Sequence, residues 1–204
     1  MKRICVFCGS GSGKRQVYRE AARDLGKLLA ERGTELVYGG GNVGLMGILA
    51  DTVIEYGGTC IGIIPQSIAD LELAHTGLTR MYYVETMQER KDKMATLSDA
   101  FIALPGGFGT LDELSEVLTH NQLRLFDKPV GLLNVAGFFD GLLNYLDHCV
   151  AEQFVRPEHR NNIFVSSDIS QLLNLLNAFE PVQIGKWISE IREESASKTL
   201  TIRK

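Results

Sequence analysis

The most constraining feature of this sequence is the alternation of short apolar runs with longer segments of helical period. The apolar runs predict β-strands, and several are apolar throughout, as strands covered on both faces should be. The predicted strands are Arg3–Gly9, Glu35–Tyr38, Cys60–Pro65, Met81–Val84, Ala100–Leu104 and Pro129–Leu133. The predicted helices are Gln16–Arg32, Leu45–Tyr56, Met87–Leu97, Leu111–Leu125, Phe138–Glu152 and Ile169–Ala178.

Repeated strand–helix alternation predicts a Rossmann-like α/β fold, in which a doubly wound, mainly parallel sheet carries helices on both faces. A chain of 204 residues fits one such domain. We expect residues 1–185 to form this single domain. Residues 186–204 are mixed and charged, and we expect them to form a surface helix or a frayed tail.

The charge balance argues against several classes of partner. The chain has 25 acidic and 21 basic residues, a formal net charge of −4 and no basic stripe, so binding to nucleic acid or to an anionic membrane is not expected. No stretch approaches the ~18 apolar residues of a membrane span. The segment MKRICVFCGS runs directly into a strand pattern, without the apolar region of a signal peptide. We therefore expect a cytoplasmic protein.

Two of the four cysteines, Cys5 and Cys8, form a Cys-x-x-Cys pattern that is found in redox pairs and in zinc sites. Their predicted strand places residues three apart on opposite faces, whereas a redox pair normally opens a helix. Cys60, Cys149 and the scattered histidines offer no second ligand pair with zinc spacing. We interpret Cys5 and Cys8 as buried thiols, and we expect neither a metal nor a cofactor.

Glycine is the most distinctive part of the composition, because eleven of the 21 glycines fall within residues 9–13, 39–47 and 106–109. Each of these three clusters follows a predicted strand. In a parallel sheet the carboxyl ends of the strands meet at one edge, where ligands bind in the crevice at which the strand order reverses. The three glycine loops are therefore expected to surround one ligand.

The first cluster, GSGSGKR at residues 9–15, lacks the spacing of a P-loop. Only three residues separate Gly9 from Gly13, and Arg15 stands where a P-loop needs a magnesium-binding serine or threonine. The loop is either a plain strand-to-helix turn or a source of N–H groups and of the Ser10 hydroxyl for a phosphate or base.

The second cluster, Gly39–Gly44, satisfies Gly-x-Gly-x-x-Gly between a strand and a helix, which is the context of a dinucleotide site. However, the next strand ends in Pro65–Gln66, without an acid for a ribose hydroxyl. Tight packing of helix on strand, with the loop forming the wall of a nucleotide pocket, fits better than NAD binding.

The third cluster, Pro105–Thr110, ends a strand and opens a helix that carries Glu113. Glycines let the backbone turn its N–H groups inward, and a helix N-terminus adds partial positive charge, so this loop predicts an anion site. We expect Thr110 to be the N-cap and a hydroxyl donor. Glu113 is then either the acid of a capping box or a functional carboxylate.

The pattern Pro-Gly-Gly-x-Gly-Thr-x-x-Glu at 105–113, preceded by Met-x-x-Arg-Lys at 87–91, resembles the lonely-guy (LOG) family of nucleotide phosphoribohydrolases. CVFCGS in the first strand and VYGGGNVGLMG at 37–47 extend the resemblance over most of residues 3–135. Family members split the N-glycosidic bond of cytokinin riboside 5′-monophosphates, and often of AMP, into free base and ribose 5-phosphate.

The resemblance implies roles for individual residues. It implies that Arg90 and Glu113 are the catalytic pair and that Lys91 assists a phosphate cradle. The cradle consists of Gly106, Gly107, Phe108, Gly109 and Thr110. Glu72 and Thr119 stand at the separations at which the family places further substrate contacts. It also implies at least a dimer, whose partner subunit helps to close the pocket.

The chain departs from the family at Gln88, where histidine is usual, and this change bears on the preference among bases. Many family members carry a lysine decarboxylase label, but no segment here resembles a pyridoxal-phosphate lysine site. Two alternatives to a cytokinin-activating enzyme are an AMP nucleosidase for purine salvage and a non-catalytic nucleotide-binding regulator or carrier. The Arg90–Glu113 pair favours an enzyme, because a pure binder has no need of a carboxylate beside an anion site.

Overall fold

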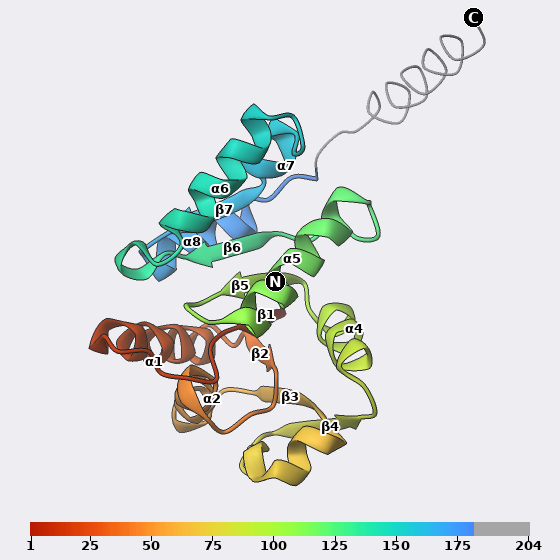
Figure 1. The fold of residues 1–204 in the computed structure, drawn as a ribbon. Coiled ribbons are helices and arrows are strands. Elements are labelled where there is room, and N and C mark those ends of the chain that lie inside the picture. Colours follow the sequence, from red (N-terminus) through yellow and green to blue (C-terminus); the bar gives the residue numbers. More distant parts are fainter. Residues whose placement is uncertain (182–204) are drawn as a thin grey trace, which may run out of the picture.

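The computed structural model of this chain describes residues 1–181, with the side chain of Glu72 excepted (Figure 1). The expected domain boundary after residue 185 and the expected surface helix or frayed tail at 186–204 lie outside the described residues. Within residues 1–181, no helix is long and apolar enough to cross a membrane.

The described residues form a seven-stranded sheet in the order β4-β3-β2-β1-β5-β6-β7, and every strand pair is parallel. The strands are β1 (Arg3–Phe7), β2 (Glu35–Tyr38), β3 (Cys60–Pro65), β4 (Arg80–Val84), β5 (Ala100–Ala103), β6 (Val130–Leu133) and β7 (Ile163–Ser166). Arg3 of β1 pairs with Glu35 of β2, and Ile4 pairs with Ala100 of β5. The predicted Rossmann-like α/β fold is confirmed.

The helices cover both faces of this sheet (Figure 1). The α-helices are α1 (Gln16–Glu31), α2 (Gly44–Glu55), α3 (Gln66–Ile68), α4 (Met87–Leu97), α5 (Phe108–Gln122), α6 (Asp140–Ala151), α7 (Pro157–Asn161) and α8 (Ile169–Asn177). A π-helical turn, η1, spans Ala69–Leu73, and a 3-10 turn, η2, spans Val135–Gly137. Helices α1, α2 and α8 pack on one face, whereas α4, α5 and α6 pack on the other.

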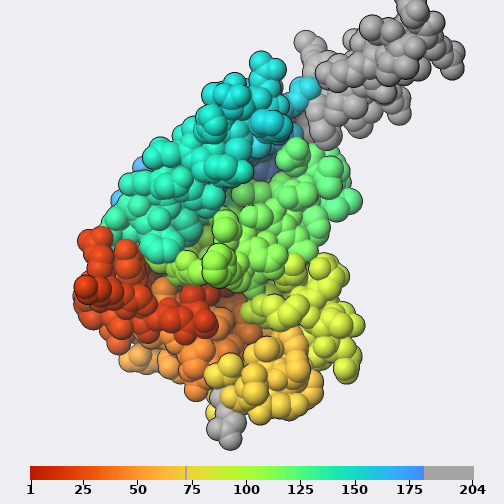
Figure 2. Space-filling view, in the orientation of Figure 1, coloured from red at the N-terminus to blue at the C-terminus, as the bar shows by residue number. Residues whose placement is uncertain are grey.

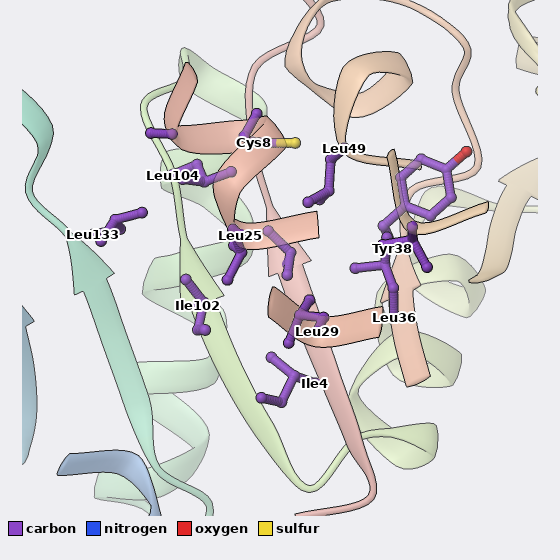
Figure 3. Close-up of a cluster of buried hydrophobic side chains, with 14 of the residues drawn as sticks. Ile4, Cys8, Leu25, Leu29, Leu36, Tyr38, Leu49, Ile102, Leu104 and Leu133 are labelled. Carbon is purple, nitrogen blue, oxygen red and sulfur yellow. The ribbon is translucent and has the colours of Figure 1, made fainter. Parts of the chain in front are cut away.

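The core consists of two apolar clusters, one on each face of the sheet. Ile4 and Cys8 point toward α1 and α2, in the cluster that Figure 3 shows, whereas Cys5 and Phe7 point to the opposite face. Alternate side chains of a strand point to opposite faces, so β1 contributes to both clusters. Cys5 and Cys8 are free and buried, and burial raises the pKa of both thiols. The interpretation of this pair as buried thiols is confirmed.

Several short elements and three helix starts differ from the prediction, and for α2 the difference is one residue, from Leu45 to Gly44. Strand β7 and helices α3 and α7 were not predicted. The two helices have three and five residues and are too short to display a helical period. Helix α6 begins at Asp140 rather than Phe138, because η2 precedes it. Helix α5 begins at Phe108 rather than Leu111, and this difference matters for the site.

The strand order places a topological switch point between β1 and β5. From β1 the chain builds outward to β4, and it then returns to the other side of β1 to build β5, β6 and β7. The loops that leave β1 and β5 therefore run to opposite sides and open a crevice at the carboxyl edge of the sheet. The fold positions the first and third glycine clusters on the two walls of this crevice.

The core packing makes a testable prediction at Leu25 of α1, which is fully buried and labelled in Figure 3. We expect Leu25→Ala to lower the free energy of unfolding by about 2–5 kcal/mol, through lost apolar burial and the cavity left behind. The control Leu125→Ala removes a side chain that is 66% exposed, and its expected effect is within about 0.5 kcal/mol. Urea unfolding measures both values, and equal losses would contradict the assigned core.

Candidate active site

The three glycine loops meet at the carboxyl edge of the sheet, as expected. The Gly9 N–H donates a hydrogen bond to the Pro105 carbonyl at 3.1 Å, which joins the first loop to the third. The Leu45 N–H donates to the Gly9 carbonyl at 3.0 Å, which joins the second loop to the first. The three loops therefore form one hydrogen-bonded backbone unit around the switch point.

Two of these glycines are required by close approach of the loops. A Cβ on Gly106 would lie 2.0 Å from the Thr110 hydroxyl oxygen and 3.0 Å from the Gly9 nitrogen. A Cβ on Gly44, whose φ is +59°, would lie 2.2 Å from the Ser10 carbonyl oxygen. Side chains at these positions would force the loops apart.

A cleft of about 330 Å³ lies between the first and third loops. Its walls are residues 9–13 and 105–107, and Tyr18, Leu45 and Phe138 complete the lining. In Figure 2 the red segment that contains α1, the green segment that contains α5 and the teal segment that contains α6 meet on one face of the molecule. The first glycine loop therefore forms one wall of this cleft.

Helix α5 starts at this cleft, with Gly107 as its N-cap. The expectation that Thr110 is the N-cap is wrong, because Phe108 and Gly109 are already helical and Thr110 lies in the first turn. The capping-box interpretation of Glu113 is wrong for the same reason. The unpaired N–H groups of the first turn and the partial positive charge of the helix end face the glycine loop, as an anion site requires.

Thr110 carries an unusual hydroxyl group. The residue is 5% exposed, and its Oγ1 atom has no hydrogen-bond partner within residues 1–181. Leaving a buried hydroxyl unpaired costs about 1–3 kcal/mol, so such a group is commonly reserved for a ligand or water. Its position in the first turn of α5 places it beside the predicted anion site.

Arg90 and Glu113 form a buried ion pair between α4 and α5. The Arg90 Nη1 atom donates to Glu113 Oε1 at 2.9 Å, and the two side chains are 12% and 7% exposed. The Arg90 Nε atom donates to the Ile63 carbonyl of β3 at 3.2 Å. The structure thus brings together the two residues that the resemblance implied as the catalytic pair.

The environment of Glu113 places opposing influences on its carboxyl group. Burial raises the pKa, and the Arg90 guanidinium opposes this by stabilising the carboxylate. Burial prevails, so the pKa of Glu113 lies above its ordinary value. Such a carboxylate is a stronger base than one in water, which suits a group that accepts a proton or stabilises a cation.

Lys91 follows Arg90 but points to a different set of partners. Its ammonium group lies 3.1 Å from an Asp112 carboxylate oxygen and 3.4 Å from a Glu116 oxygen. Partial burial lowers the pKa of Lys91, but these carboxylates outweigh it and raise the pKa above its ordinary value. Gln88 donates to the same Glu116 and to Asp92. Lys91 is therefore held against α5 by ion pairs with two carboxylates that follow the cradle segment.

Glu72 lies in the turn η1, beside the second glycine loop. The Asn42 N–H donates to the Leu73 carbonyl at 2.8 Å, and the His75 N–H donates to the Gly40 carbonyl at 2.9 Å. These bonds tie the backbone on both sides of Glu72 to the carboxyl edge of the sheet. The side chain of Glu72 is outside the described part of the structure, so its substrate contact stays a prediction.

Thr119 lies less than two turns beyond Glu113, about 9 Å further along α5. Its hydroxyl donates to the Ser115 carbonyl, and it lines a separate cavity with Leu146 and Ile163. This chain therefore does not bring Thr119 to the Arg90–Glu113 pair. Phe108 belongs to the cradle segment, but its side chain is 94% exposed.

Arg90 and Lys91 are held by groups that were not predicted as their partners. These groups are the backbone carbonyl of Ile63 and the carboxylates of Asp112 and Glu116. A carbonyl in the middle of an apolar strand leaves no mark in the sequence. Asp112 and Glu116 are spaced four apart on one helix face, which is the only signal they give. Within residues 1–181 no group of three or more His, Cys, Asp or Glu side chains is arranged to hold a metal ion.

Comparison with known proteins assigns the chain to a family. A family model described as "Possible lysine decarboxylase" matches residues 46–176, which include Arg90 and Glu113. The cytokinin riboside 5′-monophosphate phosphoribohydrolase LOG5 of Arabidopsis thaliana is 49% identical over 185 residues, which cover 90% of this chain and 81% of that protein. The chain belongs to the LOG family. The chain is also 48% identical to LOG2 of the same plant, over a stretch that covers 88% of this chain and 84% of LOG2.

Solved structures show that the fold is shared with a molybdenum cofactor binding protein and with a Moco carrier protein. The molybdenum cofactor binding protein of Rippkaea orientalis matches with a TM-score of 0.67 and 25% identity, covering 87% of this chain and 97% of that one. The Moco carrier protein of Chlamydomonas reinhardtii matches with a TM-score of 0.65 and 22% identity, covering 87% and 98%. The likeness to the second protein shows the fold alone.

The unpaired hydroxyl of Thr110 makes a prediction that separates stability from binding. Thr110→Val keeps the shape of the side chain and removes the buried hydroxyl, so the melting temperature should stay the same or rise. Affinity for a nucleoside monophosphate should fall about tenfold or more, if the hydroxyl donates to the ligand. Calorimetric unfolding and titration measure the two effects.

The matched control is Thr52→Val in α2. Thr52 is also buried, but its hydroxyl already donates to the Ile48 carbonyl at 2.7 Å. This variant should leave nucleotide affinity unchanged and gain no stability. Loss of stability without loss of affinity in Thr110→Val would contradict the assignment of its hydroxyl to a ligand.

Proposed function

We propose that this protein is a hydrolase that cleaves the N-glycosidic bond of a purine (cytokinin) riboside 5′-monophosphate to give free base and ribose 5-phosphate. The observation that carries the proposal is the buried Arg90–Glu113 pair beside a glycine loop at a helix N-terminus. The named activity of relatives that are 49% and 48% identical over most of the chain supports the same reaction.

Glu113 acts at the sugar. Breaking a ribosyl C–N bond builds positive charge on the ribose, and a nearby carboxylate stabilises this charge. The raised pKa of Glu113 also suits a group that orients or deprotonates the attacking water. The water oxygen forms the new bond to the sugar carbon, and Glu113 accepts the proton that the water loses. The electrons of the C–N bond leave with the base, which takes up a proton.

Arg90 orients the Glu113 carboxylate through its Nη1 atom and contacts the ribose. The 5′-phosphate binds the cradle of residues 106–110, at the N-terminus of α5. The phosphate is remote from the reacting carbon, so its binding energy serves to align the nucleotide. Lys91 contributes positive charge beside the cradle, and Glu72 makes a further substrate contact. Thr119 contacts a substrate only across the interface between two subunits.

The assembly we propose is a homodimer or higher homo-oligomer in the cytoplasm. Apolar side chains stand exposed around the site: Phe108 is 94% exposed, Met87 46% and Leu111 44%. A second subunit that covers these side chains accounts for them and also offers a route by which Thr119 reaches a substrate. The four free thiols agree with a reducing compartment.

The test of this function is incubation of the pure protein with AMP, with isopentenyladenosine 5′-monophosphate and with adenosine, with chromatography for free base. We expect base from the prenylated nucleotide and much slower release from adenosine, because adenosine lacks the phosphate that the cradle binds. Base from AMP alone would favour purine salvage. No base from any of them, with tight nucleotide binding retained, would favour a carrier.

Glu113→Gln isolates the role of the carboxylate. The amide keeps the size of the side chain but removes its charge and its basicity, so turnover should fall roughly 10²–10⁴-fold while nucleotide binding persists. The matched control is Glu35→Gln, because Glu35 pairs with Arg3 near the amino ends of β1 and β2. Steady-state kinetics and equilibrium titration give the two readouts. Near-normal turnover in Glu113→Gln would contradict the mechanism.

A further inference from the structure

The guanidinium group of Arg90 lies directly against the backbone of Gly39, the first residue after β2. A Cβ on Gly39 would lie 1.8 Å from Arg90 Nη2, 2.9 Å from Cζ and 3.4 Å from Nε. The three atoms nearest to that position all belong to Arg90. The guanidinium of Arg90 thus occupies the space that a side chain at residue 39 would need.

The backbone conformation of Gly39 does not itself require glycine. Gly40 and Gly44 have φ values of +73° and +59°, whereas Gly39 is not among the residues with positive φ. An alanine at position 39 is therefore compatible with the backbone, and its cost comes from the contact with Arg90. Gly39 differs in this respect from the other two glycines of the triplet. Gly40 has a positive φ, and a Cβ on Gly41 would first meet the flexible end of Met46.

Arg90 is held on three sides. Its Nε atom donates to the Ile63 carbonyl, its Nη1 atom donates to Glu113, and Nη2 lies over Gly39. The guanidinium is planar, so a group that pushes Nη2 away also moves Nη1 and Nε. A methyl group at residue 39 would therefore displace Arg90 from both of its hydrogen bonds.

We propose that Gly39 is a positioning residue, whose missing side chain seats the Arg90 guanidinium against Glu113. The inference rests on the proposed function for its catalytic consequence, but the seating itself is a property of the resting protein. Gly39 acts through Arg90 and touches no reacting atom. The first residue of the glycine triplet at 39–41 therefore contributes to the position of the catalytic pair.

The pKa of Glu113 should report whether Gly39 has this role. The Arg90 charge opposes the rise in the pKa of Glu113 that burial causes. A displaced guanidinium opposes it less, so the pKa of Glu113 should rise further. If the ionised carboxylate is the active form, activity falls as the pH drops through this pKa, and the acid limb of the rate profile moves to higher pH.

The experiment compares Gly39→Ala with wild type and with the control Gly141→Ala. Gly141 lies exposed in α6, and no atom lies within 4 Å of its added Cβ. We expect Gly39→Ala to lower kcat by about 10²-fold, the cost of a misplacement of roughly 1 Å in an active site. Its acid limb should move up by about one pH unit, whereas Gly141→Ala should match wild type in both respects.

A double variant tests whether the effect passes through Arg90. In Arg90→Ala the guanidinium is gone, so adding Gly39→Ala should change neither kcat nor melting temperature further. If Gly39→Ala alone fails to fold, the double variant should still fold as well as Arg90→Ala. An equal loss from Gly39→Ala in both backgrounds would overturn the proposal.

The resting protein provides a readout that does not depend on turnover. A ¹³C NMR titration of the Glu113 carboxyl should show a higher pKa in Gly39→Ala than in wild type. If wild type releases base but Gly39→Ala keeps the wild-type kcat, acid limb and Glu113 titration, the positioning role is refuted and the proposed function stands. If wild type releases no base, the proposed function fails, and the titration alone decides whether Gly39 seats Arg90.

Discussion

The ion pair between Arg90 and Glu113 is the interaction on which the site depends. Both side chains are almost fully buried, and each charge would be costly to bury without the other. The pair joins α4 to α5 above the carboxyl ends of the central strands, and the Ile63 carbonyl and the bare backbone of Gly39 hold the guanidinium there. Truncation of either partner therefore leaves an uncompensated charge in a confined space.

The parallel sheet explains why this pair lies near the predicted anion site. Strand order reverses between β1 and β5, so the loops that leave these strands open the crevice and are joined by the bond from Gly9 to Pro105. Helix α5 begins at that crevice, and its first turn supplies N–H groups and the unpaired Thr110 hydroxyl. The same helix carries Glu113 one turn later. The predicted anion site and a buried carboxylate therefore lie next to each other on α5.

The local sequence pattern predicted the strands and helices well where segments are long or strongly apolar. Strands β2 and β3 and helix α4 have the predicted bounds, and the opposite orientations of Cys5 and Cys8 follow from strand geometry alone. The start of α5 was predicted wrongly because Thr-x-x-Glu resembles a capping box. In the structure Thr110 packs its hydroxyl against Gly106 instead, and this contact depends on the turn of the glycine loop.

The sequence by itself determined the fold class, the shared edge of the three glycine loops and the residue types of the site, because these follow from periodicity, strand polarity and motif. Only the tertiary structure decided that Arg90 meets Glu113, that Lys91 turns to Asp112 and Glu116, that Thr119 lies in another cavity and that Gly39 makes room for a guanidinium. These are contacts between residues far apart in the chain, between different helices and strands. Their distances depend on how the helices pack on the sheet, which no local pattern encodes.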